Sequence, residues 1–114
     1  MSQLPLDGIR VLDSTYVFAL PYAGGLLADF GAEVIKLEGP GHPDTTRTAG
    51  LAGAYPENEL GEDWWNRPST YNLIHRGKSS LTLDMTNERG RDLFRQLVAV
   101  SDVVVENFSP RVME

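Results

Sequence analysis

Two stretches of this chain share one order of elements, and they constrain the fold more than any other feature. Residues 26–40 and 97–110 each begin with helix-like apolar spacing, continue into a short run rich in β-branched residues, and reach a glutamate near a turn residue. A helix followed by a strand is half of a βαβ unit, so two such stretches predict a parallel sheet with a ligand crevice at its edge. The two stretches are only loosely similar, and we interpret the likeness as shared architecture and not as a sequence repeat.

Further patterns extend this α/β prediction to four strands. Strands are expected at residues 9–13, 33–37, 80–84 and 102–106. The first helix should begin near Pro21 and end at Gly31. Its apolar face would consist of Ala19, Ala23, Leu26, Leu27 and Phe30. A later helix should follow a cap at Thr86 or Asn87. Its apolar face would consist of Leu93, Phe94, Leu97, Val98 and Val100.

The domain organisation is predicted from what interrupts and what ends this pattern. From residue 39 to about residue 72 the sequence is rich in glycine, proline and polar residues, which predicts an excursion containing short helical pieces or facing a substrate. Residues 107–114 follow the last predicted strand and are too few to cover one face of the sheet. Another chain could complete the sheet, but we favour residues 1–114 as the N-terminal segment of a longer chain.

Composition argues against several classes of function. The chain has no cysteine, so a disulfide, a thiolate metal site and a cysteine nucleophile are excluded within it. The net charge of −6 argues against nucleic acid and anionic membranes as partners. The longest apolar runs are far below the ~20 residues that cross a bilayer, and the first residues lack a basic region. We therefore expect a cytoplasmic protein.

Three short patterns resemble known sites but do not meet their requirements. Gly77-Lys78-Ser79 has the tail of a P-loop, but the first glycine of that loop would fall at Asn72, so the lysine is expected to be a solvated turn residue. The first strand is not followed by G-x-G-x-x-G, because Gly24-Gly25 lies within the helical pattern. His42 and His75 lie in separate predicted loops, so no metal site is expected.

Several longer segments occur in an order that is itself informative. They are residues 6–13 (LDGIRVLD), 27–38 (LADFGAEVIKLE), 76–84 (RGKSSLTLD) and 102–110 (DVVVENFSP), and smaller matches between them include Ala19, Pro21, Gly41, Asp44, Arg47 and Gly90-Arg91. Together, in this order, these segments resemble the family III CoA-transferases, also called the CaiB/BaiF family. The resemblance extends over nearly the whole chain.

The resemblance implies a Rossmann-like α/β domain, the N-terminal part of a larger protein that forms an interlocked homodimer. Coenzyme A would be a substrate and not a resident cofactor. The family moves CoA from an acyl-CoA donor to a free carboxylic acid through an aspartyl anhydride and an enzyme-CoA thioester. Its aspartate lies beyond residue 114, so no catalytic residue is assigned here. An α-methylacyl-CoA racemase-like enzyme of the same fold, and an inactive CoA-binding fragment, are the alternatives.

The resemblance also assigns CoA contacts position by position. The loop after the first strand supplies Val17, Phe18 and Ala19 near the thioester, although relatives often have glutamine at the position of Phe18. Gly39 occupies a position where relatives often carry an arginine that reaches the adenine-phosphate end. The third strand leads into the nucleotide-facing residues Leu83, Asp84, Met85 and Thr86. The fourth strand leads into the pantetheine-facing residues Asn107, Phe108 and Ser109.

Residue chemistry gives each of these assignments a structural alternative. Phe18 could pack beneath its loop, and Gly39 could simply belong to the turn that Pro40-Gly41 requires. Asp84 could cap the following helix, and Asn107 could adopt a positive φ in a turn.

Overall fold

The computed structural model describes residues 3–48 and 51–114, and a parallel four-stranded sheet lies at its centre. The strands β1 (Arg10–Asp13), β2 (Glu33–Glu38), β3 (Ser79–Thr82) and β4 (Val103–Val105) are ordered β3-β2-β1-β4. Val11 lies opposite Val34 in β2 and opposite Val103 in β4, which fixes the register of the central strands. The predicted α/β fold is confirmed, and each strand boundary lies within two residues of its expected position.

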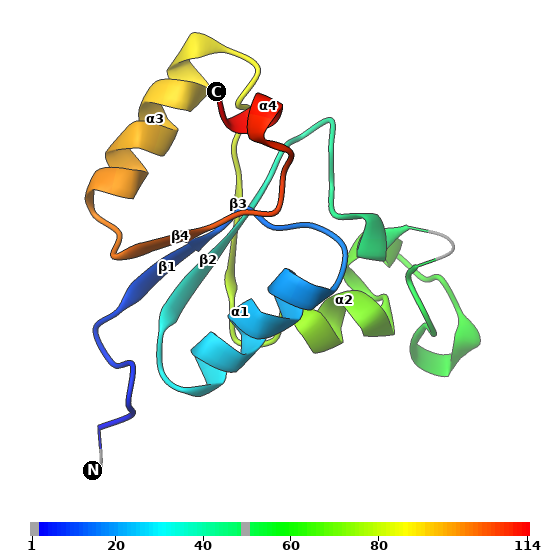
Figure 1. Ribbon diagram of the computed structural model, residues 1–114. Coiled ribbons are helices and arrows are strands. Elements are labelled where there is room, and N and C mark those ends of the chain that lie inside the picture. Colours follow the sequence, from blue (N-terminus) through cyan, green and yellow to red (C-terminus); the bar gives the residue numbers. More distant parts are fainter. Residues whose placement is uncertain (1–2, 49–50) are drawn as a thin grey trace.

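The helices cover both faces of this sheet (Figure 1). Helix α1 (Ala19–Asp29) and helix α2 (Ser69–Ile74) lie on one face, and helix α3 (Glu88–Ala99) and the short α4 (Pro110–Met113) lie on the other. The chain passes outward from β1 to β2 and β3, and then returns past them to pair β4 with the opposite side of β1. Open α/β sheets bind ligands at such a reversal, beside the carboxyl ends of the strands.

Helix α1 begins and ends as the sequence predicted, with Pro21 in its first turn and Gly31 just beyond its end. Gly31 has a φ of 102°, a left-handed conformation that favours glycine. Leu27 packs against the core cluster formed by Val11, Ala32 and Val34. This contact joins the helix to the two central strands.

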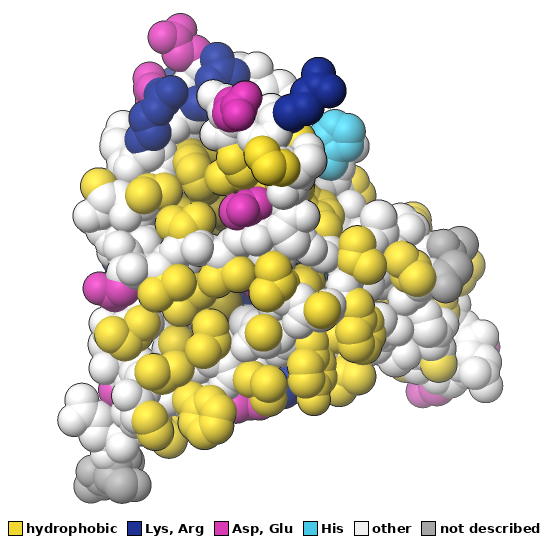
Figure 2. Space-filling model, in the orientation of Figure 1, with side chains coloured by type: hydrophobic (Ala, Val, Ile, Leu, Met, Phe, Trp, Pro, Cys, Tyr) yellow, Lys and Arg dark blue, Asp and Glu magenta, His cyan; other side chains and the backbone are white. Residues whose placement is uncertain are grey.

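The predicted apolar face of α1 is wrong for most of its length. Leu26 and Phe30 are exposed, and hydrophobic side chains gather on the molecular surface where α1 lies (Figure 2). The helix instead buries Pro21, Gly24 and Gly25. A Cβ atom at Gly24 would lie 2.9 Å from both Asp13 Oδ2 and Lys78 Nζ. Glycine thus lets the helix backbone approach a charged pair, which hydrophobic spacing alone does not reveal.

Helix α3 is capped by Asn87, whose Oδ1 accepts a hydrogen bond from the Gly90 N–H at 2.8 Å. Of the two predicted caps, Asn87 is therefore the correct one. The predicted apolar face of this helix is confirmed only in its middle, where Phe94, Leu97 and Val98 are half-buried. The flanking Leu93 and Val100 are exposed.

The stretch between β2 and β3 contains the short helical pieces that its composition predicted. Single 3₁₀ turns occur at η1 (Thr45–Arg47), η2 (Pro56–Asn58) and η3 (Trp64–Asn66), and α2 follows. Trp64 and Trp65 are partly exposed and meet edge to face. Across residues 3–48 and 51–114, no helix is both long and apolar enough to cross a membrane.

Candidate functional site

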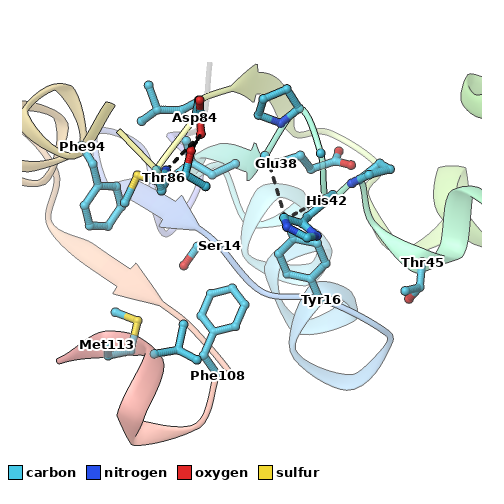
Figure 3. A pocket seen from close by; sticks show the side chains of 18 residues that line it. Ser14, Tyr16, Glu38, His42, Thr45, Asp84, Thr86, Phe94, Phe108 and Met113 are labelled. Atoms are coloured by element: carbon cyan, nitrogen blue, oxygen red, sulfur yellow. Dashed lines mark hydrogen bonds between the residues drawn. The ribbon is translucent and has the colours of Figure 1, made fainter. Parts of the chain in front are cut away.

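A cavity of about 700 Å³ lies at the carboxyl ends of the strands. Ser14 and Tyr16 follow β1, residues 37–43 end and follow β2, residues 83–86 follow β3, and Phe108 follows β4. Phe94, Phe108 and Met113 line one side of the cavity, and Tyr16 and His42 lie across from them (Figure 3). A mostly apolar cavity with a few polar groups is typical of a small-molecule site.

The predicted CoA-binding residues are divided between the wall of this cavity and its surroundings. Gly39, Phe108 and residues 83–86, which are Leu83, Asp84, Met85 and Thr86, line the wall. Val17, Phe18, Ala19, Asn107 and Ser109 are not part of the wall, although Val17 follows the wall residue Tyr16, and Asn107 and Ser109 flank the wall residue Phe108. The sequence did not predict that Tyr16, His42, Phe94 or Met113 would line this wall. His42 was considered only as a metal ligand and Phe94 only as part of a helix face, and Tyr16 and Met113 occur in no recognisable ligand motif.

Asp84 organises the turn that leads from β3 into the cavity wall. Its Oδ1 accepts hydrogen bonds from the Thr86 N–H at 3.0 Å and from the Thr86 hydroxyl at 2.6 Å, and its Oδ2 accepts one from the Asn87 amide at 2.8 Å. The Thr86 hydroxyl, followed by the Thr86 N–H, holds the pKa of Asp84 below its ordinary value. Because Asn87 caps α3, the alternative that Asp84 caps it is wrong.

The start of α3 packs directly against this turn. A Cβ atom at Gly90 would lie 1.7 Å from the backbone oxygen of Asp84, so a larger residue cannot fit without displacing the turn. The turn that forms this part of the cavity wall therefore requires glycine at position 90. No nucleotide-binding motif in the sequence indicated this requirement.

The loop after β1 carries the first three predicted contacts, which follow the wall residue Tyr16 and do not line the cavity. Val17 has a φ of 75°, which is rare for a β-branched residue. Phe18 is 50% exposed and stacks on Tyr22 with a ring-centroid distance of 6.2 Å, so the alternative that it packs beneath the loop is wrong. Ala19 is the first residue of α1.

Asn107 and Ser109 lie in the turn after β4. The backbone of Asn107 does not have a positive φ, so that alternative is wrong. Its side-chain oxygen accepts from the Tyr16 N–H at 3.0 Å, and its side-chain NH₂ donates to the Tyr16 carbonyl at 2.8 Å. Ser109 precedes α4 and is exposed.

Gly39 begins a turn in which its carbonyl accepts from the His42 N–H at 3.1 Å. The Tyr16 hydroxyl donates to the His42 carbonyl at 2.8 Å and braces this turn from the β1 side. Gly39 does not have a positive φ, and a Cβ atom there would meet its nearest neighbour at 3.8 Å. Gly39 therefore belongs to the turn at Pro40 and Gly41, as the structural alternative expected, although its own backbone conformation does not require glycine.

Lys78 is not the solvated turn residue that the sequence predicted, because its side chain is only 1% exposed. Its ammonium lies 2.6 Å from Asp13 Oδ2, 2.6 Å from the Pro21 carbonyl and 3.0 Å from His75 Nδ1. The left-handed Gly77 directs the chain into β3, and Gly24 leaves room above the ion pair. The three acceptors use all three N–H groups of the lysine.

The interactions of Lys78 continue through His75 to Asp44 and Lys36. His75 Nε2 lies 3.3 Å from Asp44 Oδ2, and Lys36 Nζ lies 3.1 Å from the same oxygen. Burial lowers the pKa of His75, and the nearby Asp44 offsets this only in part. Burial alone would raise the pKa of Asp44, but contacts with His75 and Thr46 and the charge of Lys36 hold it well below its ordinary value.

A second part of the same network surrounds Glu38. Arg47 Nε donates to Glu38 Oε2 at 2.9 Å, Arg47 Nη2 donates to Oε1 at 2.8 Å, and the Tyr71 hydroxyl donates to Oε1 at 2.9 Å. Glu38 Oε2 also accepts from the Asp44 N–H at 2.7 Å, which joins the two parts. The members of this buried charge cluster are Asp13, Lys36, Glu38, Asp44, Arg47, Tyr71, His75 and Lys78.

The sequence carries a signal for part of the buried charge cluster. Alternate residues of a strand share a face, so Lys36 and Glu38 must lie on the same side of β2 as the core residue Val34. Two charged residues on a buried face predict buried partners. In the part of the chain that the structure describes, no three His, Cys, Asp or Glu side chains gather in a way that could hold a metal ion.

Comparison with known proteins agrees with this architecture. The chain is 42% identical over 112 residues to the succinyl-CoA–L-malate CoA-transferase alpha subunit of Chloroflexus aurantiacus, a match that covers 98% of this chain and 24% of that protein. It is 41% identical over 110 residues to the succinyl-CoA:glutarate CoA-transferase of Mus musculus, covering 96% of this chain and 23% of that protein. It thus spans about a quarter of the length of these curated relatives.

A solved structure and a family model lead to the same assignment. The crystal structure of a CaiB/BaiF family protein from Brucella suis superimposes with a TM-score of 0.74 at 42% identity, covering 94% of this chain and 26% of that one. The model of CoA-transferase family III matches residues 6–114. The strand-end cavity, the ordered segments and these matches together show that the chain belongs to CoA-transferase family III.

Proposed function

We propose that this chain supplies the CoA-binding surface of an acyl-CoA:carboxylate CoA-transferase. The observation that carries the proposal is the cavity at the carboxyl ends of the strands, lined by Gly39, by residues 83–86 and by Phe108. Its apolar wall suits the uncharged parts of an acyl-CoA, and its position beside the reversal of strand order suits a nucleotide-containing ligand. Val17, Phe18, Ala19 and Ser109 would border this surface, and Asn107, whose side chain pairs with the Tyr16 backbone, would support it.

The nucleophilic aspartate is proposed to come from outside this chain. Asp84 is the aspartate in the cavity wall, and both of its oxygens accept hydrogen bonds within its own turn. Asp13 and Asp44 are buried and paired with lysines. A carboxylate that is free to attack a thioester is therefore better supplied by another part of the full-length protein.

The proposed reaction proceeds through two anhydride intermediates. The aspartate carboxylate attacks the donor thioester carbonyl and expels CoA thiolate, which leaves an acyl-aspartyl anhydride. The thiolate then attacks the aspartyl carbonyl, forming an enzyme-CoA thioester and releasing the donor acid. The acceptor carboxylate attacks this thioester and expels CoA thiolate again. Attack of the thiolate on the acceptor carbonyl yields the new acyl-CoA and restores the aspartate.

We extend the proposal to dicarboxylic acids as the class of acceptor. The names of the two curated relatives above include malate and glutarate, and another relative is an acetyl-CoA:oxalate CoA-transferase of Acetobacter aceti that is 37% identical over 110 residues. Malate, glutarate and oxalate are all dicarboxylates. The family resemblance extends the proposal to an interlocked homodimer, and the sequence composition extends it to a cytoplasmic location.

Calorimetry and a transfer assay on the full-length protein test this function. CoA should bind saturably, and Met85→Trp, which places a larger ring in the cavity wall, should weaken binding roughly 10- to 100-fold, since a steric clash in a packed site amounts to about 1–3 kcal/mol. The exposed Leu60→Trp, outside the cavity, is the matched control and should bind as the unchanged protein does.

Covalent trapping distinguishes transfer from the racemase alternative. After incubation with an acyl-CoA, borohydride should reduce one aspartyl thioester, which peptide mass spectrometry should locate outside residues 1–114. Absence of CoA binding at millimolar concentration would contradict the proposed surface. Exchange of the α-proton with deuterated solvent, without transfer to any dicarboxylate, would assign the racemase chemistry instead.

A further inference from the structure

The loop between β1 and α1 contains a residue in an unfavourable backbone conformation. Val17 has a φ of 75°, in the left-handed region where a β-branched side chain crowds the backbone. Such a conformation is unfavourable and persists only where the surrounding structure enforces it. Contacts with neighbouring groups must therefore hold this loop in place.

Both ends of the loop are fixed by the buried charge cluster. At the β1 end, Asp13 Oδ1 accepts from the Thr15 N–H at 3.0 Å and also from the Thr15 hydroxyl. At the helix end, Lys78 Nζ donates to the Pro21 carbonyl in the first turn of α1 at 2.6 Å. Neither contact reaches the middle of the loop, where Tyr16 precedes the strained Val17.

Asn107, in the turn after the neighbouring strand β4, holds the middle of the loop. Its amide oxygen and NH₂ pair with the N–H and the carbonyl of Tyr16 at 3.0 and 2.8 Å. Just before this point, the Ser14 N–H donates to the Val105 carbonyl at 3.0 Å, the last backbone bond between the two segments. The Asn107 side chain thus continues the β1–β4 pairing by offering one donor and one acceptor, as a strand neighbour would.

We propose that Asn107 is a positioning residue: by pairing with both backbone groups of Tyr16, it holds residues 17–19 in the conformation that meets the thioester end of acyl-CoA. This inference rests on the proposed function and deepens it. The Asn107 side chain acts through Tyr16 and does not need to touch the substrate. Misplacement of a reactive group by about 1 Å can lower a rate on the order of 100-fold. The effect of Asn107 is accordingly on turnover and not on CoA affinity.

Two substitutions in the full-length protein test this role. Asn107→Asp keeps an acceptor for the Tyr16 N–H but sets a carboxylate oxygen against the Tyr16 carbonyl, and Asn107→Leu removes both bonds. Each should lower kcat roughly 10- to 100-fold while the Kd for CoA changes less than about threefold. Hydrogen exchange in residues 14–18 should accelerate about fivefold in Asn107→Leu, the equivalent of one lost hydrogen bond.

Asn72→Asp is the matched control. The Asn72 NH₂ also donates to two backbone carbonyls, those of Asn66 and Pro68, each at 3.0 Å, but it lies outside the cavity and the β1 loop. Asn72→Asp should leave kcat unchanged, and it should also leave hydrogen exchange in residues 14–18 unchanged.

Each outcome decides for or against the proposal. A rise in the Kd for CoA that accounts for the lost activity would make Asn107 a direct ligand contact and overturn it. An unchanged kcat, or a failure of both Asn107 variants to fold, would overturn it as well. If the unchanged protein neither binds CoA nor transfers it, the proposed function fails first. If it does both while the variants remain fully active, only the role of Asn107 fails.

Discussion

The carboxyl ends of the strands are used in opposite ways on the two faces of this sheet. Toward α3 and α4 they form an open, mostly apolar cavity, whereas toward α1 and α2 they carry the closed, buried charge cluster. Glu38 belongs to both regions, because it lines the cavity and pairs with Arg47. The cavity leaves space for a ligand, whereas the cluster joins β1, β2, η1, α2 and β3 through charges that satisfy one another. One face thus carries the proposed ligand site, and the other fixes the strand ends that surround it.

The largest expected effect comes from removing one charge of the cluster. Lys78→Met leaves the Asp13 carboxylate buried without its cation, which should destabilise the protein by about 3–5 kcal/mol. Arg95→Met is the control, because it removes one partner of the exposed Arg95–Asp92 pair and should change stability by less than about 1 kcal/mol. Urea unfolding of the full-length protein measures both. Equal effects of the two variants would show that the cluster is solvated and that our contrast between the faces is wrong.

A smaller effect is expected on the cavity face, where backbone packing dominates. Alanine normally stabilises a helix relative to glycine by about 1 kcal/mol, but Gly90→Ala should instead destabilise the protein by about 1–3 kcal/mol and weaken CoA binding. The reason is the 1.7 Å approach of the added Cβ atom to the Asp84 carbonyl. Gly41→Ala meets no atom within 4 Å and should leave the melting temperature unchanged. A more stable Gly90→Ala variant would mean that α3 does not pack against the turn as described.

The smallest effect should be the loss of stability on mild acidification. It should arise in the buried charge cluster, at His75, and not in the cavity. Burial lowers the pKa of His75 from its unfolded-state value of 6.5, so the unfolded chain binds the proton more tightly. The contribution of His75 to the free energy of unfolding is therefore complete above pH 6.5 and is lost as the pH falls below that value. The free energy of unfolding should fall by at most about 1.4 kcal/mol per pH unit. His75→Gln, whose amide can still face Asp44 and Lys78, should flatten this slope between pH 5 and 7. An unchanged slope in urea titrations would exclude His75 as its origin.

The features that the sequence predicted correctly are those with local causes. The strands follow short apolar runs, α1 ends at Gly31, and α3 is capped by Asn87, each a matter of a few neighbouring residues. The segments that contribute to the cavity wall were also predicted, because parallel strands bring their carboxyl ends to one edge.

The features that the sequence did not predict depend on which distant segments meet. Lys78 looked like a solvated residue because its neighbours in the chain are polar, and its partner Asp13 lies 65 residues away. The buried face of α1 was misjudged for the same reason, since Gly24 carries no hydrophobic signal and is buried only because that ion pair lies beneath it. Tyr16 and His42 belong to two different loops, which a hydrogen bond from the Tyr16 hydroxyl to the His42 carbonyl brings together at the cavity.

The Asp13–Lys78 pair also bears on how the sheet assembles. Asp13 comes into place with β1 and α1, whereas Lys78 arrives only with β3, after the long excursion has closed. Either half formed alone would bury one ionised group without its counter-ion, a penalty of several kcal/mol that favours leaving that half open to water. Neither the half with Asp13 nor the half with Lys78 is therefore stable when the other half is unfolded. The ion pair makes the two halves cooperative, so that this part of the chain gains its stability in a single step.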